Sequence, residues 1–410
     1  MSEAALQPVK STTSMASRRN QMFVGSVRVT NCRSLLYIGT NSGTSRHRAL
    51  ALGRLGYDVF IIDPAAFLPH SRFVSAWTWH TGGLFVEHFV RRKVLENIPS
   101  NNFDLVYVDG GELAGPSLIL ELKNRFGSVI NYNLDDPYGR RDGRRWKLYL
   151  RSVPFYDLVV VVRDSNVPEA IARGARNVLR AHRSADEIAH APRQISRQDW
   201  QKWGSEIVFV GTWMPERGHF MARLIELGVP LSIYGGRWQK AREWPVLRSC
   251  WRGATLEREQ DYAMAIQCAK VSLGLLSKGN RDLTTQRSFE IPHLGGVLCA
   301  ERTPEHSELY REDEEAVFWS SPEECAEKCM QLLQDEPRRK RLAMNGRRRC
   351  LHNGTTNQKV LAQVLQQALL PDDAHSSFAN VKSSAEAAGS YDSKHLLRSD
   401  EPRLSRHPCE

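Results

Sequence analysis

Side chains suited to binding a phosphate-bearing ligand gather in one segment, residues 278–292. It follows an apolar run that is typical of a strand, and it leads into a helical pattern. Guanidinium and ammonium groups there suit a diphosphate, and a carboxylate inside the helix suits the two hydroxyl groups of a ribose. The cations are Lys278, Arg281 and Arg287, and the acids are Asp282 and Glu290.

Two adjacent acids, Asp135 and Asp136, end another apolar run (Ser128 to Asp136). Adjacent side chains that leave a strand point in different directions, so one of the two is expected to face a site. A carboxylate within hydrogen-bond reach of a hydroxyl group can act as a general base. The alternative is that Asp136 caps the turn before Pro137.

A third candidate is the loop Gly39-Thr40-Asn41-Ser42-Gly43-Thr44, between the first predicted strand and its helix. Small residues there let backbone amides approach an anion, and a helix N-terminus favours negative charge. Gly39, Asn41, Gly43 and Thr44 are therefore candidates for an anion-binding loop. The spacing is that of neither a dinucleotide-binding nor a P-loop motif, and a plain tight turn remains the alternative.

The elements that must position these residues alternate between apolar runs and helical patterns. Parallel strands covered on both faces show such runs without polar alternation. The pattern restarts after a polar stretch at 184–204, so the sequence predicts an α/β protein with two doubly wound, Rossmann-like domains that face each other across a cleft. The predicted strands are 34–39, 57–63, 103–110, 128–136, 156–162, 177–182, 206–211, 231–236, 271–277, 297–301 and 316–320.

The expected organisation has five parts. They are a disordered tail with a lead-in at 1–33, a first domain at 34–190, a second domain at 205–350, a helix packing across both domains at 351–370, and a disordered tail at 371–410. The tails are polar and lack sustained periodicity.

Composition favours an ordinary globular protein. The chain has 410 residues, of which 41% are hydrophobic and 25% charged. No apolar run approaches the roughly 20 residues of a membrane helix, and no secretory segment is evident, so we expect a cytoplasmic protein. Eight scattered cysteines are expected to be reduced, and Cys325 with Cys329, one helical turn apart, make too weak a metal site to assign one.

The net charge of +10 is concentrated in two runs, 138–151 and 337–349. Such runs can bind phosphate groups of nucleic acid, nucleotides or lipids, although a solvated helix face is the commoner explanation. No recognised nucleic-acid motif accompanies them, so we expect no nucleic-acid partner. The first run directly follows Asp135 and Asp136, which leaves open an anionic acceptor or a membrane surface that carries one.

Four stretches resemble the spore-maturation CgeB-like glycosyltransferases, which have the two-domain GT-B fold. The resemblance spans about 34–365 and is strongest in FVGTWMPERG (209–218), LSIYGGRW (231–238), residues 280–306 and EEAVFWSSPEE (314–324). It implies sugar transfer from a nucleotide-sugar donor held by the second domain to an acceptor held by the first. The alternative is a catalytically silent GT-B protein that binds a nucleotide sugar or a partner.

The resemblance also implies roles for particular residues. Two acids with seven residues between them grip sugar and ribose in such enzymes, and Asp282 and Glu290 fit that spacing, although the first position is usually Glu. Arg237, Lys278, Arg281 and Arg287 would neutralise the leaving diphosphate, so neither a metal nor another cofactor is expected. In the first domain, Asp135 or Asp136 would face the acceptor, and Asp135 is the preferred base.

Overall fold

The structure is a computed structural model, and it describes residues 33–254, 256 and 259–369. The described residues from Arg33 onward belong to one compact unit. The tail predicted at 371–410 and all but the last residue of the one predicted at 1–33 lie outside the described residues.

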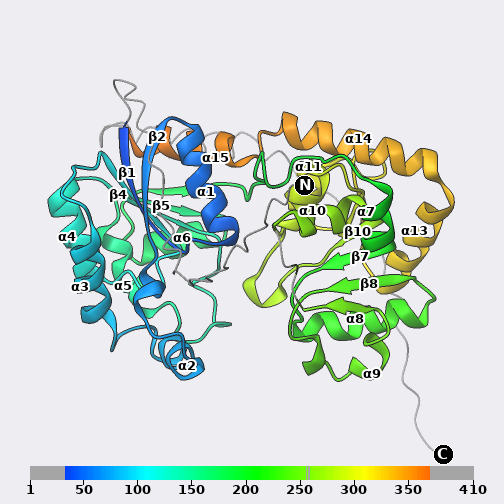
Figure 1. Cartoon of the computed structure of the whole chain (residues 1–410), viewed down its shortest axis with the longest axis horizontal. Helices are drawn as coiled ribbons and strands as arrows, with labels where there is room; N and C mark the ends of the chain where they lie inside the picture. Colours follow the sequence, from blue (N-terminus) through cyan, green and yellow to red (C-terminus); the bar gives the residue numbers. More distant parts are fainter. Residues whose placement is uncertain (1–32, 255, 257–258, 370–410) are drawn as a thin grey trace, which may run out of the picture. The chain divides into compact units, whose positions relative to one another are not determined.

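Two six-stranded sheets form the framework, and every pair of neighbouring strands is parallel. The first has the order β2-β1-β3-β4-β5-β6, and the second β12-β11-β10-β7-β8-β9. The predicted fold class, two doubly wound Rossmann-like units, is confirmed (Figure 1). The strands of the first sheet are β1 (Arg33–Ile38), β2 (Tyr57–Ile62), β3 (Leu105–Asp109), β4 (Val129–Asn133), β5 (Leu158–Val161) and β6 (Val178–Arg180). Those of the second are β7 (Ser205–Val210), β8 (Leu231–Tyr234), β9 (Trp251–Gly253), β10 (Ala269–Gly274), β11 (Leu298–Glu301) and β12 (Val317–Trp319).

Alternate residues of each central strand enter different cores, which explains why these strands lack polar positions. In β1, Leu36 and Ile38 pack in one cluster, and Leu35 and Tyr37 pack in the other. Helices α3 (Glu87–Asn97), α4 (Pro116–Phe126) and α5 (Lys147–Ser152) contribute to the first cluster, and α1 (Gly43–Arg54) contributes to the second. Both faces of the sheet are therefore covered, as parallel sheets require.

The second sheet is covered in the same way. One core joins β7 to α8 (Pro215–Glu226), α9 (Trp244–Leu247) and α13 (Pro322–Gln334). The other core joins it to α7 (Arg197–Trp203), α10 (Glu259–Gln267), α11 (Arg287–His293) and α14 (Glu336–His352). Two further helices are α6 (Asn166–Ala172) and α12 (Pro304–Leu309). None of the helices among the described residues is both long and apolar enough to cross a bilayer.

The last described helix, α15 (Asn357–Ala368), belongs to the core of the first sheet. Val360, Leu361, Val364 and Leu365 are buried in the cluster that contains Leu35 of β1 and the buried residues of α1. The chain therefore returns to the first sheet after completing the second.

Besides the short helices α5, α9 and α12 and the 3₁₀ turns, three elements have no counterpart in the sequence prediction. Helix α2 (Arg72–Thr81) carries exposed aromatic side chains, which give no buried stripe. Strand β9 has only three residues at a sheet edge. Helix α7 lies in the stretch interpreted as a polar linker, and Ser196 and Asp199 begin it with a capping box.

Shortening Leu361 tests whether α15 stabilises the first sheet. Because this side chain is 1% exposed, we expect Leu361→Ala to lower the free energy of unfolding by about 3 kcal/mol, measured by denaturant titration. Gln363→Ala, on the exposed face of the same helix, is the control. Equal stability of the two variants would contradict this role.

Candidate functional site

A pocket of about 780 Å³ lies at the carboxyl ends of β1, β3 and β4. Its lining includes the loop after β1, residues 108–114 around the end of β3, and residues 133–135 after β4. The strand order of the sheet reverses between β1 and β3, and doubly wound sheets bind ligands at such a reversal.

Asp135 lines this pocket, and its side chain is 43% exposed. The loop is fixed by Asn133, whose side-chain oxygen accepts a hydrogen bond from the Asp135 amide at 2.9 Å. Withdrawal from water raises the pKa of the Asp135 carboxyl above its ordinary value, against the lowering effect of Arg145. An accessible carboxylate with a raised pKa is suited to accept a proton.

Arg145 connects two acids of the pocket. Its Nη1 atom lies 3.7 Å from Asp135 Oδ2, and its Nε atom donates a 2.8 Å hydrogen bond to Glu112 Oε2. Burial raises the pKa of Glu112, and Arg145 again opposes the shift. Glu112 was not a sequence candidate, and Arg145 was considered only as part of the basic run directly after the two aspartates.

Asp136 does not line the pocket. Its carboxylate is buried and accepts hydrogen bonds from the Gly139 amide, the Asn166 amide group and both sides of the Arg281 guanidinium, at 2.7–3.0 Å. Although burial alone would raise its pKa, the bonds from Arg281 and Asn166 hold it below the ordinary value. Asp136 is a structural anion, which matches the capping alternative more closely than the catalytic one.

Asp282 is held in a similar way by arginines that follow β5 and β6. Its Oδ1 atom accepts hydrogen bonds from Arg163 Nε at 2.9 Å and from Arg183 Nη2 at 2.8 Å, and all three side chains are at most 7% exposed. The structure therefore places Asp282 and Arg281 in contacts with the first sheet's loops. The sequence assigned both residues to donor binding, whereas in the structure both side chains are bound to residues that are distant in the sequence.

The four candidates of the anion-binding loop separate. Gly39, Gly43 and Thr44 line the pocket, and Asn41 does not. A side chain at Gly39 would come within 2.8 Å of the Asp109 Cβ atom, so the strand turns into the loop only with glycine there. The carboxylate of Asp63 accepts the Asn41 amide at 3.2 Å and also lines the pocket, which disfavours an anion at that end. Asp109, at the end of β3, accepts two hydrogen bonds from buried Arg48.

In the second sheet, the carboxyl ends of β7, β8 and β10 converge on Gly211. Gly235, with φ at +135°, approaches so closely that a Cβ atom there would lie 2.1 Å from the Gly211 carbonyl oxygen. Arg217 of α8 is 8% exposed and donates to the carbonyl oxygens of Thr212, Leu275 and Leu276. The strand order reverses between β7 and β10, so Arg217 fixes this second reversal point.

Glu290 lies on α11, beside the end of β7. It is 1% exposed and is paired with Arg287, whose Nε atom donates to the Val210 carbonyl oxygen at 2.9 Å. Burial would raise the pKa of Glu290, but Arg287 and His190 lower it below the ordinary value. The Nε2 atom of His190 lies 3.4 Å from the carboxylate, and its Nδ1 atom accepts the Asp186 amide. His190 was not predicted, since it lies in the polar stretch between the sheets.

Two predicted cations remain accessible. Arg237 is exposed in the turn after β8, with φ at +68°. Lys278 is 56% exposed and pairs with Glu301. Together with Arg217, Arg287 and Glu290, they border the carboxyl ends of the second sheet. Four of the predicted donor residues therefore lie at the second sheet. The other two, Arg281 and Asp282, bind loops of the first sheet.

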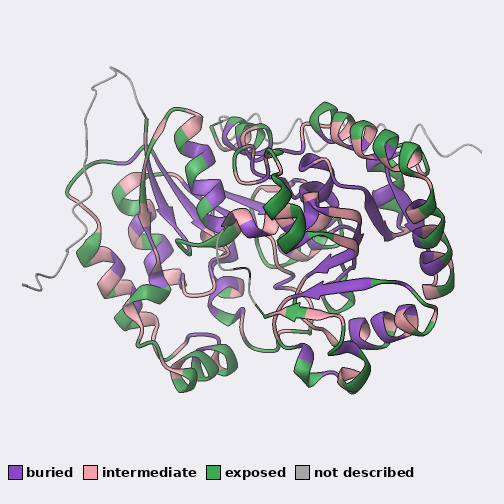
Figure 2. Cartoon of the chain, turned by 45° about the vertical axis from the view of Figure 1, so that its right-hand side comes forward, coloured by how far each residue is buried: buried purple, intermediate pink, exposed green. Residues whose placement is uncertain are grey.

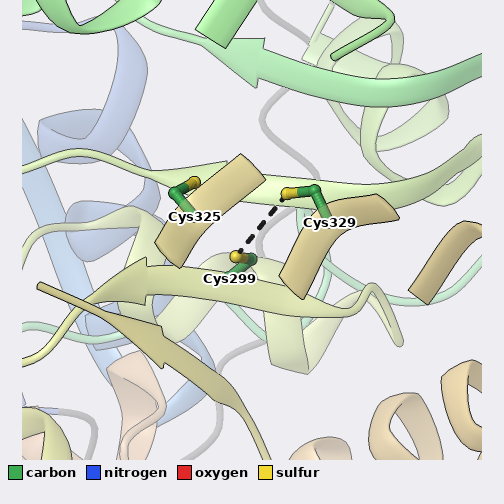
Figure 3. Close-up of side chains that lie close together, drawn as sticks. All are labelled: Cys299, Cys325 and Cys329. Carbon is green, nitrogen blue, oxygen red and sulfur yellow. Dashed lines mark hydrogen bonds between the residues drawn. The ribbon is translucent and has the colours of Figure 1, made fainter. Parts of the chain in front are cut away.

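A group of three cysteines lies in the second sheet's core, away from the two sets of residues described above. Cys299 of β11 and Cys325 and Cys329 of α13 point toward one another, with their sulfur atoms within 4.8 Å (Figure 3). All three are fully buried in the apolar core of the second sheet. Three thiolates with a divalent cation would leave an unbalanced negative charge there and lack the fourth ligand of a structural zinc site. The expectation that these cysteines hold no metal stays a prediction.

Comparison with known families matches part of the chain. Residues 217–366 match a family model described as "Glycosyl transferase-like", and this range begins inside α8 and contains β10 and α11. The match supports glycosyl transfer. No curated protein matches the chain.

Solved structures match almost the whole described chain in fold. A sucrose-phosphate synthase from Thermosynechococcus elongatus has a TM-score of 0.59 at 12% identity, covering 82% of this chain and 98% of that one. The N-terminal domain of trehalose-6-phosphate phosphatase from Candida albicans has 0.57 at 11%, covering 86% and 98%. Anabaena HepE, solved with UDP-glucose, has 0.56 at 11%, covering 81% and 98%. At these identities the likeness establishes the fold, which is that of two-domain GT-B glycosyltransferases.

Removing Arg281 tests the role of Asp136. Arg281→Ala leaves a buried carboxylate without its cation, and we expect a loss of about 2 kcal/mol in the free energy of unfolding, because Arg281 itself is partly exposed. Since the folded pKa of Asp136 is lowered, its contribution is present above about pH 4 and is lost as pH falls through the folded pKa. The wild type should therefore lose more stability than the variant between neutral and acidic pH. Arg92→Ala, in an exposed pair, is the control, and equal losses from both substitutions would refute this role.

Removing Arg145 tests the electrostatics of the pocket. Arg145 lowers the pKa of Asp135, so Arg145→Ala should raise it further. A base must be deprotonated to act, so the acidic limb of the pH profile of kcat/KM should move to higher pH. An unmoved limb in an active variant would exclude Asp135 as the group that titrates.

Proposed function

We propose that this protein transfers a glycosyl group from a nucleotide sugar to an acceptor hydroxyl group held in the 780 Å³ pocket. The observation that carries the proposal is Asp135, an accessible carboxylate with a raised pKa at the reversal point of the first sheet. The family match over 217–366 supports a donor site in the second sheet. HepE, a protein of similar fold, was solved with UDP-glucose.

In the proposed reaction, Asp135 accepts the proton of the acceptor hydroxyl group. The acceptor oxygen then forms a bond to the anomeric carbon, and the bond from that carbon to the diphosphate oxygen breaks with its electron pair. Such a direct displacement inverts the anomeric configuration. In a retaining reaction Asp135 would only orient the acceptor, so the configuration of the product distinguishes the two roles.

On the donor side, Arg237, Lys278 and Arg287 are proposed to balance the charge of the leaving diphosphate, and Glu290 to accept ribose hydroxyl groups. The exposure of Arg237 and Lys278 supports this assignment. Since cations of the chain serve this role, we propose that transfer requires neither a metal nor another cofactor. Arg281 and Asp282 are left out, because their charges are matched by Asp136, Arg163 and other groups of the first sheet's loops.

Membership of the CgeB-like group is a narrower proposal, and it rests on the sequence stretches that resemble that group. A cytoplasmic location is proposed as well, supported by the free thiols of the six cysteines among the described residues. The acceptor is proposed to be anionic or membrane-associated, because the basic run 138–151 adjoins the pocket.

A catalytically silent protein that binds a nucleotide sugar is the second candidate. It is favoured by one observation: Glu290, the proposed ribose acid, is already paired with Arg287 and 1% exposed. A donor could bind Glu290 only by replacing its hydrogen bond to Arg287. Donor binding without any transfer by the wild type would decide for this candidate.

The experiment begins by screening nucleotide sugars for thermal stabilisation, since a ligand of the folded state raises the melting temperature. With the donor found, we expect Asp135→Asn to reduce kcat by about 10²- to 10⁴-fold while the donor still stabilises the variant. Asp58→Asn, an exposed carboxylate on β2, is the control. Assays with a chelator should give the wild-type rate.

Three results would count against the proposal. If no nucleotide sugar stabilises the protein, the proposed donor binding is wrong. If kcat is unchanged in Asp135→Asn, Asp135 is not the base. If a chelator abolishes activity and added metal restores it, transfer depends on a metal.

A further inference from the structure

An unusual share of exposed aromatic rings lies in one short segment of the first half, residues 73–89. Solvent reaches 87% of Phe73, 55% of Trp77, 39% of Trp79, 74% of Phe85 and 45% of Phe89. Elsewhere among the described residues, only Phe60 and Trp200 are aromatic side chains with comparable exposure. Large apolar groups so concentrated on a surface mark an interaction site.

Phe73, Trp77 and Phe85 lie on one side of α2, and we call these three rings the aromatic surface. Phe73 and Trp77 are four residues apart on α2, so they share one face of the helix. The ring of Trp77 lies 5.6 Å from that of Phe85, in the turn that leads to α3. Nearly all of α2 is exposed or half-exposed (Figure 2), so the described chain leaves this face uncovered.

Cations border the aromatic surface. Gly82, which ends α2 with φ at +66°, packs so tightly on the basic run that a Cβ atom there would meet the backbone of Arg144 and the Cβ atom of Lys147. Both of these cations are exposed. On the pocket side of the same helix, the guanidinium of Arg145 lies 4.5 Å from the centre of the Trp79 ring. Residues 72–97 and 138–151 together contain ten Lys and Arg against three Asp and Glu.

The opposite side of α2 lines the pocket of Asp135. Val74, Ser75, Thr78 and Trp79 all contribute to its wall. A single helix therefore separates the aromatic surface from the proposed acceptor site. Whatever binds the surface therefore lies one helix away from this pocket.

We propose that the aromatic surface docks onto an anionic lipid bilayer, and that the acceptor is an amphiphile whose polar headgroup enters the pocket from that bilayer. Tryptophan and phenylalanine partition into the interface between headgroups and acyl chains, and nearby Lys and Arg are attracted to anionic headgroups. This combination of rings and cations favours a lipid surface over a protein partner, because a protein interface depletes lysine from its core. The statement about the acceptor rests on the proposed function, whereas docking does not.

Co-sedimentation of the full chain with vesicles tests the docking without any sugar donor. We expect binding to vesicles of phosphatidylcholine with about one third phosphatidylglycerol, and weaker binding to phosphatidylcholine alone, because the cations contribute. The double substitution of Trp77→Ser and Phe85→Ser should weaken binding at least tenfold. Trp200→Ser, an exposed ring on α7, should bind as the wild type does.

Charge reversal provides a second comparison. The double substitution of Arg144→Glu and Lys147→Glu should weaken binding to the anionic vesicles. The matched control is Lys340→Glu with Arg341→Glu, which makes the same charge change on exposed residues of α14, within the other basic run. If the α14 variant loses binding and the Arg144 variant does not, the proposed surface is wrong.

Other outcomes also decide. Failure of the wild type to bind either vesicle would overturn the docking. Self-association that the ring substitutions abolish, without vesicle binding, would assign the surface to a second copy of the chain instead. If vesicles bind but transfer is never found, docking stands and the proposed function fails; if transfer proceeds only to water-soluble acceptors, the lipid acceptor fails.

Discussion

Two buried carboxylates, Asp136 and Asp282, determine how the loops of the two sheets meet. Each carboxylate follows a strand of one sheet and is neutralised by arginines that follow strands of the other sheet. Arg281 neutralises Asp136, and Arg163 and Arg183 neutralise Asp282. A buried charge without its partner is costly, so these contacts specify one arrangement of the loops. The loop that carries Asp135 is held through its immediate neighbour. The proposed base is therefore positioned by an interaction in which it takes no part.

Adjacent acids consequently acquire opposite properties. The pKa of Asp136 is lowered by the groups that donate to its carboxylate, whereas that of Asp135 is raised by withdrawal from water and is only partly compensated by Arg145. The alternation of side-chain direction beyond a strand directs one carboxylate into the pocket and the other into the protein. One residue type thus supplies both a fixed anion and the proposed base, and the environment of each carboxylate makes the difference.

The architecture was predictable from sequence because apolar runs and helical periodicity are local. Strand β9 escaped because its residues, Trp-Arg-Gly, form no apolar run, and α2 escaped because its rings face solvent. The position of Asp135 beside a pocket could be inferred from its place after a strand. The ion pairs that Arg281 and Asp282 form could not be predicted, since the partners of both residues lie more than 90 residues away in sequence. Glu112 and His190 lie in segments without periodicity, so no local signal identifies them.

The return of α15 to the first sheet makes that unit discontinuous along the chain. Its core contains β1, near the start of the described residues, and Leu361, near their end. Domains generally fold as they emerge during synthesis, with the N-terminal one first. Here the first sheet emerges early but lacks one covering helix until the second sheet has been made. Its exposed apolar face must persist through that interval, which couples completion of the first unit to synthesis of the whole chain.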